Sequence, residues 1–144
     1  DIKVEIFEID ILKFDSHIDF YKQLNEKPSG VICCIGYLGN QEKAEIDFFE
    51  SKRVINSNYM GIVSILNIIA EDFEARGSGF IIGIASVAGL RGRKSNYIYG
   101  SAKAGLIAYL SGLRNRLSHS DVQVITVNPG FVNTQMTRNL NYLH

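Results

Sequence analysis

The centre of this sequence is a short apolar run that ends at a serine and leads, through a basic loop, into a helical segment. Residues 80–85, Phe-Ile-Ile-Gly-Ile-Ala, have the composition of a buried strand. A helix is expected over residues 96–118, and Tyr99 and Lys103 stand four positions apart within it, on one helix face. Ser86 follows the strand directly, at the edge where open α/β sheets bind ligands.

The Tyr99–Lys103 pair is suited to acid–base chemistry. A free phenol titrates near pH ~10. A neighbouring ammonium group favours the phenolate and so lowers the pKa of a tyrosine. We therefore expect Lys103 to bring the pKa of Tyr99 closer to a working pH.

Strand-like and helix-like segments alternate along the rest of the chain, which predicts parallel βαβ units. Apolar and charged residues alternate in residues 3–9, which predicts a strand with one wetter face. Asp15 or Ser16 is the expected N-cap of the first helix. The remaining strands are expected over 31–35, 80–85 and 122–127, and the helices over 15–25, 42–51, 52–76 and 96–118.

Composition indicates one globular unit and gives no electrostatic case for nucleic acid or an anionic membrane as a partner. The chain has 144 residues, 46% of them hydrophobic, with 15 basic and 15 acidic residues. The longest apolar stretch, residues 61–70, is too short to cross a bilayer. Cys33 and Cys34 are adjacent, which favours reduced thiols, and the three histidines lack the spacing of metal ligands. We expect a cytoplasmic protein without a metal site.

The central segment resembles the short-chain dehydrogenase/reductase family. The family signature is a serine about a dozen residues before Tyr-x-x-x-Lys, and the strings Ser86-Val-Ala-Gly and Tyr99-Gly-Ser-Ala-Lys103-Ala-Gly match it. The resemblance implies an NAD- or NADP-dependent oxidoreductase that interconverts a hydroxyl and a carbonyl on a small or sugar-like substrate. It implies that Tyr99 is the general acid–base, that Lys103 binds the nicotinamide ribose and that Ser86 holds the substrate oxygen.

Asn58, with Gly61 three residues later, resembles the Asn-x-x-Gly of the family. The resemblance implies that Asn58 holds a water that links Lys103 to solvent. Asn56 is the alternative if the register differs by two residues, and a polar side chain satisfied inside a helix is the alternative for the role itself.

The resemblance also implies contacts with the cofactor. Asp10-Ile11 corresponds to the adenine-binding position, although a strand-end carboxylate is an equal interpretation of Asp10. Residues 33–36, Cys-Cys-Ile-Gly, stand where the family has Asn-Asn-Ala-Gly, and residues 129–134 resemble its Pro-Gly-x-x-x-Thr, which holds the nicotinamide carboxamide. The implied cofactor-binding residues are Asp10, Ile11, Gly36, Tyr99, Lys103, Pro129, Gly130, Val132 and Thr134.

The resemblance implies a Rossmann-like doubly wound parallel sheet in a three-layer α/β sandwich that lacks its first βαβ unit. The family begins with a strand and a glycine-rich turn that binds the pyrophosphate. This chain has no such segment, and residues 3–9 correspond to the third strand of the family. In the strand order 3-2-1-4-5-6, the two absent strands would separate residues 3–9 from 31–35. We therefore expect residues 1–144 to be a partial domain, also without the C-terminal strand, that is inactive alone.

Substrate and partners are less constrained. Arg91, Arg93 and Lys94 precede Tyr99 and would suit a phosphate or a polar sugar, with a solvated loop as the alternative. The surrounding string resembles a branch near the decaprenylphosphoryl-ketoribose reductases, which act on a lipid-linked sugar phosphate. Small residues on the helix of 96–118 indicate a homodimer or homotetramer, with intrachain packing as the alternative.

Two other functions are compatible with the same fold. The first is a catalytically silent binding or scaffold fragment, against which Ser86, Tyr99 and Lys103 are all present. The second is a sugar-nucleotide epimerase or dehydratase, against which the Pro129-Gly130 turn follows Lys103 at a short distance. The choice between NAD and NADP stays open, because the discriminating residues lie on the absent second strand.

Overall fold

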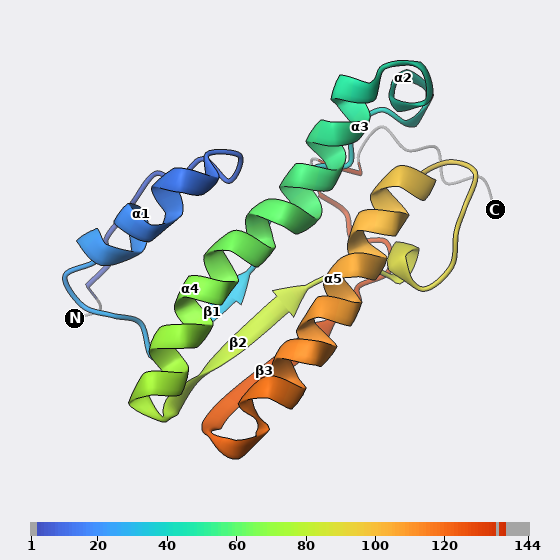
Figure 1. Cartoon of the computed structure of the whole chain (residues 1–144). Coiled ribbons are helices and arrows are strands. Elements are labelled where there is room, and N and C mark those ends of the chain that lie inside the picture. The colour runs from blue at the N-terminus through green and yellow to red at the C-terminus, as the bar shows by residue number, and fades with distance from the viewer. Residues whose placement is uncertain (1–2, 135, 138–144) are drawn as a thin grey trace.

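A three-stranded parallel sheet forms the centre of the computed structural model, which describes residues 3–134 and 136–137. Its strands are β1 (Gly30–Cys33), β2 (Ser78–Ile84) and β3 (Asp121–Val127), in the order β1-β2-β3 (Figure 1). Residue 30 pairs with residue 80, and residue 78 pairs with residue 121, so a long crossover leads from each strand to the next. The predicted parallel α/β class is confirmed.

Helices occupy both crossovers. The first contains α2 (Gln41–Ile46), α3 (Phe48–Ile55), a π-helical segment (Asn56–Met60) and α4 (Gly61–Arg76). The second contains α5 (Tyr97–Arg116), and α1 (His17–Gln23) precedes β1 and packs on α4. Figure 1 shows α4 and α5 over the same side of the sheet. Two right-handed crossovers that advance in one direction produce this arrangement. Short 3-10 turns cover Phe14–Ser16, Val87–Gly89 and Leu117–His119.

Side-chain caps set the helix boundaries after β1. Asn40 Oδ1 accepts a hydrogen bond from the backbone three residues later at 2.8 Å, and Asp47 Oδ1 accepts one from two residues later at 2.9 Å. The helix expected over 42–51 is therefore divided at Asp47. The second part runs on without a break through the π-helical segment into α4. Gly77, with φ of +66°, ends α4 as predicted.

The strand predicted over residues 3–9 is not formed. These residues have no regular secondary structure, and Val4 and Ile6 are 76% and 93% exposed. A strand needs a neighbour for its backbone hydrogen bonds, and none of the described residues pairs with this segment in a sheet. Ser16 stands at the expected N-cap of α1, but its hydroxyl donates to Lys13 O instead of capping the helix.

The core lies between the sheet and the helices α4 and α5. Buried residues of both helices meet Ile81, Val122 and Val124 of the sheet. Gly83 allows α5 to approach, because a Cβ at this position would lie 2.3 Å from Cδ1 of Leu110. α5 therefore packs closely on the sheet. Its first turn, which carries Tyr99, lies near the end of β2.

The other face of the sheet is apolar and open among the described residues. Ile32, Phe80, Ile125 and Val127 alternate with the buried positions and are exposed, Ile32 at 60%. The described residues therefore supply two layers, sheet and helices, of the predicted three.

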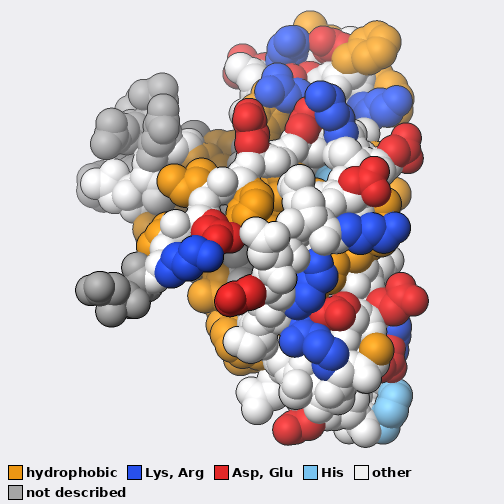
Figure 2. All heavy atoms as spheres, turned by 90° about the vertical axis from the view of Figure 1, so that its left-hand side faces the viewer, with side chains coloured by type: hydrophobic (Ala, Val, Ile, Leu, Met, Phe, Trp, Pro, Cys, Tyr) orange, Lys and Arg blue, Asp and Glu red, His pale blue; other side chains and the backbone are white. Residues whose placement is uncertain are grey.

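The outer surface carries mixed charges. Figure 2 shows basic and acidic side chains interspersed over one face, with apolar side chains at its upper end, where Figure 1 draws α2 and the start of α3. Ile46, Phe48 and Phe49 are the exposed apolar residues of that region. No described helix is both long enough and apolar enough to cross a membrane.

Candidate active site

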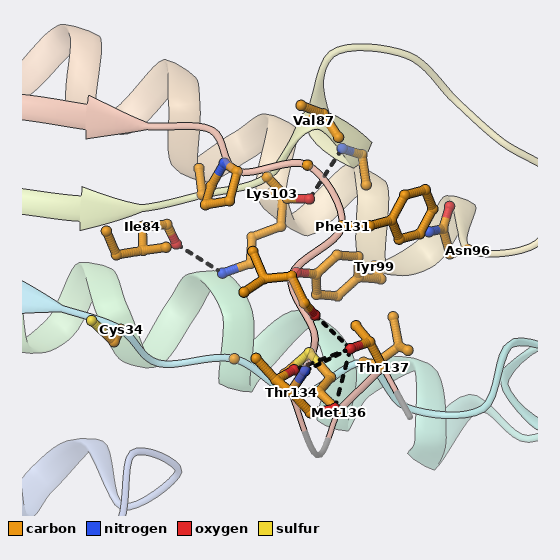
Figure 3. Close-up of a pocket in the computed structure, with 18 of the residues that line it drawn as sticks. Cys34, Ile84, Val87, Asn96, Tyr99, Lys103, Phe131, Thr134, Met136 and Thr137 are labelled. Atoms are coloured by element: carbon orange, nitrogen blue, oxygen red, sulfur yellow. Dashed lines mark hydrogen bonds between the residues drawn. The ribbon is translucent and has the colours of Figure 1, made fainter. Parts of the chain in front are cut away.

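A pocket of about 340 Å³ opens where the three parallel strands end. The segments that follow β1, β2 and β3 form three of its walls, and the first turns of α5 form another (Figure 3). Ser86, Tyr99 and Lys103, which the sequence predicted to lie close together, all line it. The pocket is at the carboxyl edge of the sheet, as expected for a ligand site of an open α/β fold.

Lys103 is buried at the base of this pocket, with 2% of its surface exposed. Its Nζ donates hydrogen bonds to Ile35 O and Ile84 O, both at 3.2 Å, and so joins the ends of the segments from β1 and β2. Burial lowers the pKa of Lys103, while the nearby thiols of Cys33 and Cys34 act in the opposite direction.

Tyr99 lies beside Lys103 and is 9% exposed, with its ring centroid 5.8 Å from Lys103 Nζ. Burial raises the pKa of Tyr99, and the neighbouring Ser86 hydroxyl lowers it to a smaller extent. The expected lowering of the Tyr99 pKa by Lys103 is not found, and the net effect of the surroundings is to raise this pKa. The physical reason is that the Lys103 ammonium is directed to backbone carbonyls, while the phenol loses water on burial.

Ser86 stands between the end of β2 and the 3-10 turn Val87–Gly89. Its Oγ accepts a hydrogen bond from Ala88 N at 3.1 Å, which fixes the start of this turn. Val87 N donates to Pro129 O at 3.1 Å, so the loops after β2 and β3 are joined. Ser86 is thereby held on a short, well-connected segment opposite Tyr99.

Asn58 is fully buried in the π-helical segment. Its Oδ1 accepts from Tyr37 N at 3.1 Å, and its Nδ2 donates to Tyr37 O at 2.6 Å and to Val54 O at 2.8 Å. Asn58, not Asn56, thus holds the turn after β1. A Cβ at Gly36 would lie 3.5 Å from Asn58 Oδ1 and 3.8 Å from Lys103 Nζ, so Gly36 keeps the space beside the ammonium open. The role of Asn58 in holding a water stays a prediction.

The remaining predicted cofactor residues fall into two groups. Pro129, Gly130, Val132 and Thr134 line the same pocket as the Ser–Tyr–Lys group. Asp10 and Ile11 line a second, open hollow, which reaches Ile35 from the other side. A Cβ at Gly61 would lie 2.3 Å from Ile11 O, which explains why the Asn-x-x-Gly string needs glycine at this position.

Several pocket residues were not assigned to the site from the sequence. Cys34 lines the pocket, whereas Cys33 is buried in the core. Of the three loop cations, Arg93 lines the pocket. Asn96, directly before α5, also lines it. Asn96 was expected as the first residue of the helix over 96–118, and its side-chain environment had no sequence signal. Among the described residues, no group of acidic, cysteine and histidine side chains could hold a metal ion.

A parallel α/β sheet whose strand ends gather a serine, a tyrosine and a buried lysine around one pocket defines a Rossmann-like protein with a candidate site at the carboxyl edge of its sheet. Residues 1–142 match the family described as short chain dehydrogenase. The chain belongs to this family.

Individual relatives agree with this assignment. The chain is 38% identical over 109 residues to an uncharacterized oxidoreductase of Mycobacterium tuberculosis, covering 76% of this chain and 44% of the relative. A short chain dehydrogenase from Burkholderia cenocepacia in complex with NADP superimposes with a TM-score of 0.83 at 24% identity, over 93% of this chain and 56% of the other. An NAD⁺-bound xylitol dehydrogenase gives 0.77 at 20% identity, over 89% and 51%. The chain spans about half the length of the curated relatives it matches.

Proposed function

We propose that this chain carries the nicotinamide-side half of the active site of an NAD- or NADP-dependent oxidoreductase, which interconverts a hydroxyl and a carbonyl on a small molecule. The observation that carries the proposal is the convergence of Ser86, Tyr99 and buried Lys103 on one pocket at the strand ends. Family membership supports it, as do the NADP and NAD⁺ bound to two structural neighbours.

The residues of the pocket fit a nicotinamide nucleoside. A lysine ammonium has three N–H donors, and two of those of Lys103 are used by Ile35 O and Ile84 O, which leaves one for a ribose hydroxyl. Gly36 keeps the space beside this ammonium open. Pro129, Gly130, Val132 and Thr134, which the family resemblance assigns to the nicotinamide carboxamide, line the same pocket. When bound, the nicotinamide accepts or supplies the hydride.

The side chains have distinct roles in the reaction. Tyr99, as a neutral phenol, gives its proton to the substrate oxygen during carbonyl reduction and, as a phenolate, takes a proton from the alcohol in the reverse direction. The Ser86 hydroxyl donates a hydrogen bond to the same oxygen and stabilises the negative charge that develops there. Lys103 holds the ribose of the nicotinamide nucleotide through its remaining N–H donor.

Replacement of the proton donor tests this mechanism. In the protein expressed from its complete reading frame, Tyr99→Phe should lower kcat by roughly 10²–10⁴-fold, because the proton transfer is lost. The dissociation constant of the nicotinamide nucleotide should stay within about two-fold, since the ring is retained. Turnover is followed by nicotinamide absorbance, and binding by fluorescence titration.

Tyr97→Phe is the matched control, since Tyr97 lies two residues earlier on α5 and is exposed. It should leave both quantities unchanged. Retained turnover in Tyr99→Phe would exclude the acid–base role. Nucleotide binding without any turnover in the parent protein would favour the alternative of a catalytically silent binding or scaffold fragment.

We further propose a polar substrate, with a sugar or a lipid-linked sugar phosphate as the candidate. Arg93 lines the pocket, whereas Lys94, the next residue, is exposed and does not line it. Arg93→Ala should therefore raise the KM of a phosphorylated substrate by about 10-fold, the effect of one lost charged hydrogen bond, while Lys94→Ala should not. Equal KM values for the two variants would contradict a phosphate contact of Arg93 and favour the alternative of a solvated loop.

We also propose a homodimer or homotetramer. Small residues at Ser101, Ala104, Gly105 and Ala108 of α5 support it, since none of them is fully buried within the chain. Sedimentation equilibrium of the purified protein distinguishes this proposal from a monomer.

A further inference from the structure

Asn96 occupies the position directly before α5, on the wall of the pocket that this helix contributes (Figure 3). Its backbone N donates to Arg93 O at 3.1 Å, and its carbonyl accepts from Gly100 N at 2.7 Å. The backbone of Asn96 thus closes the loop and begins the helix. The side chain is free to serve a different purpose.

An asparagine at this position normally caps the helix with its side-chain oxygen, which accepts from the second or third N–H of the first turn. Asn96 makes no such bond. The N–H of Ile98, the second residue of α5, donates instead to Gln41 Oε1 of α2 at 3.3 Å. Gln41 therefore does part of the work of the cap from outside the helix, and the amide of Asn96 is not needed for it.

The oxygen of this amide is buried and lacks a partner. Among the residues that the structure describes, Asn96 Oδ1 is the buried side-chain polar atom without a hydrogen bond. Buried polar groups are nearly always paired, because an unpaired one opposes folding, and an exception needs a physical explanation. Oδ1 itself is shielded from water-sized groups, but Asn96 as a residue lines the pocket, so a ligand group can reach this oxygen after a small turn of the side chain.

We propose that Asn96 hydrogen-bonds a hydroxyl group of the substrate, close to the carbon on which Tyr99 and Ser86 act, and that the substrate is a polyhydroxylated ketone or its alcohol. This inference rests on the proposed function. Asn96 precedes Tyr99 by three residues and both line the same pocket, so the amide and the phenol can contact one ligand.

The chemistry of the amide selects a hydroxyl over an anionic group at this position. An amide presents one acceptor and two donors, and rotation about χ2 exchanges its two ends. A hydroxyl can both donate and accept, and so pairs with either end. A phosphate or carboxylate oxygen can only accept, which would leave Oδ1 unpaired.

Two ketones with the same skeleton test the inference: erythrulose, with hydroxyl groups beside the carbonyl, and butan-2-one, without them. The protein expressed from its complete reading frame should reduce erythrulose with the higher kcat/KM. Asn96→Leu should lower kcat/KM for erythrulose by about 10-fold to 100-fold, because a hydrogen bond to the substrate is lost, and leave butan-2-one within about two-fold. Asn115→Leu, an exposed asparagine on the same helix, should change neither value.

The outcomes separate this inference from the function on which it rests. An equal effect of Asn96→Leu on both ketones, or no effect, would overturn the role of Asn96. Reduction of butan-2-one without reduction of erythrulose would overturn the substrate class while the oxidoreductase assignment stands. Nucleotide binding without reduction of either ketone would overturn the substrate class and favour the catalytically silent fragment. Absence of both nucleotide binding and turnover would overturn the proposed function itself.

Discussion

At the scale of single residues, Lys103 shows how a charged side chain that lines the pocket can also be part of the core. Its ammonium is bonded to carbonyls at the ends of two segments of the sheet, so it is held in place before any ligand arrives. Lysines are almost never fully buried without partners. The fixed position of Lys103 provides a positive charge at the base of the pocket without a change of rotamer, which is the preorganisation that acid–base sites require.

The pKa of Tyr99 predicts a pH dependence. Because the pKa is raised, alcohol oxidation, which needs the phenolate, should become faster as the pH rises toward that pKa. Carbonyl reduction, which needs the neutral phenol, should be constant at lower pH and decrease when the pH passes the pKa. Ser86 lowers the pKa, so Ser86→Ala should raise it and move both transitions to higher pH, besides lowering kcat.

Profiles of kcat/KM against pH in both directions measure this shift, with Ser95→Ala in the exposed loop as the control. A transition that stays in place in Ser86→Ala, or moves to lower pH, would contradict the assigned interaction.

The sequence predicted the central residues of the site because local rules determine them. The spacing of Tyr99 and Lys103 within a helix, and the place of Ser86 after a strand, follow from periodicity. The direction of the Tyr99 pKa shift depends on burial, which periodicity does not measure. The environment of Asn96 depends on Gln41, separated from Ile98 by 57 positions, and no local pattern reports such a contact.

At the scale of elements, the π-helical segment Asn56–Met60 connects the first crossover to the site. A widened turn leaves helix carbonyls without their usual N–H partners. Asn58 Nδ2 donates to Val54 O, four residues earlier at the start of this region, and the same amide bonds both backbone groups of Tyr37. One side chain therefore stabilises the distortion and attaches the turn after β1 to the helix.

Asn58→Ala should lower the free energy of unfolding by about 2–3 kcal/mol, since three hydrogen bonds are lost and buried backbone groups are left unpaired. Chemical denaturation measures this change. Asn67→Ala, which removes one exposed hydrogen bond to Tyr109, is the control and should cost about 1 kcal/mol or less. An Asn58→Ala protein as stable as the parent would show that the turn does not depend on this amide.

The positions of most helices and strands could be predicted, but some boundaries could not. Gly77 ends α4 as its conformational preference predicts. The division at Asp47 was not predicted, because an aspartate that caps a helix and one on a solvated helix face look alike in sequence. The π-helical segment lies within the helix predicted over residues 52–76, and no sequence pattern distinguishes it from ordinary helix.

At the scale of the whole molecule, the chain has a complete core on one face of its sheet and an open face on the other. The parallel class could be predicted from the alternation of elements. The absence of the strand predicted over residues 3–9 could not be foreseen, since strand formation requires a neighbour that local patterning does not guarantee. The partial-domain boundary stays a prediction, and the chain spans about half the length of its curated relatives.

The register of the sheet also bears on how the chain is made. Residue 30 pairs with residue 80, and residue 78 with residue 121, so neither strand pair can close until the intervening crossover has been synthesised. At about 5–20 residues per second, β2 follows β1 out of the ribosome after a delay of roughly a few seconds. During that interval Val31 and Ile32 cannot yet pair with β2, and α2, α3 and α4 leave the ribosome before it. The pairing of β1 with β2 is therefore a late event in the synthesis of this part of the chain.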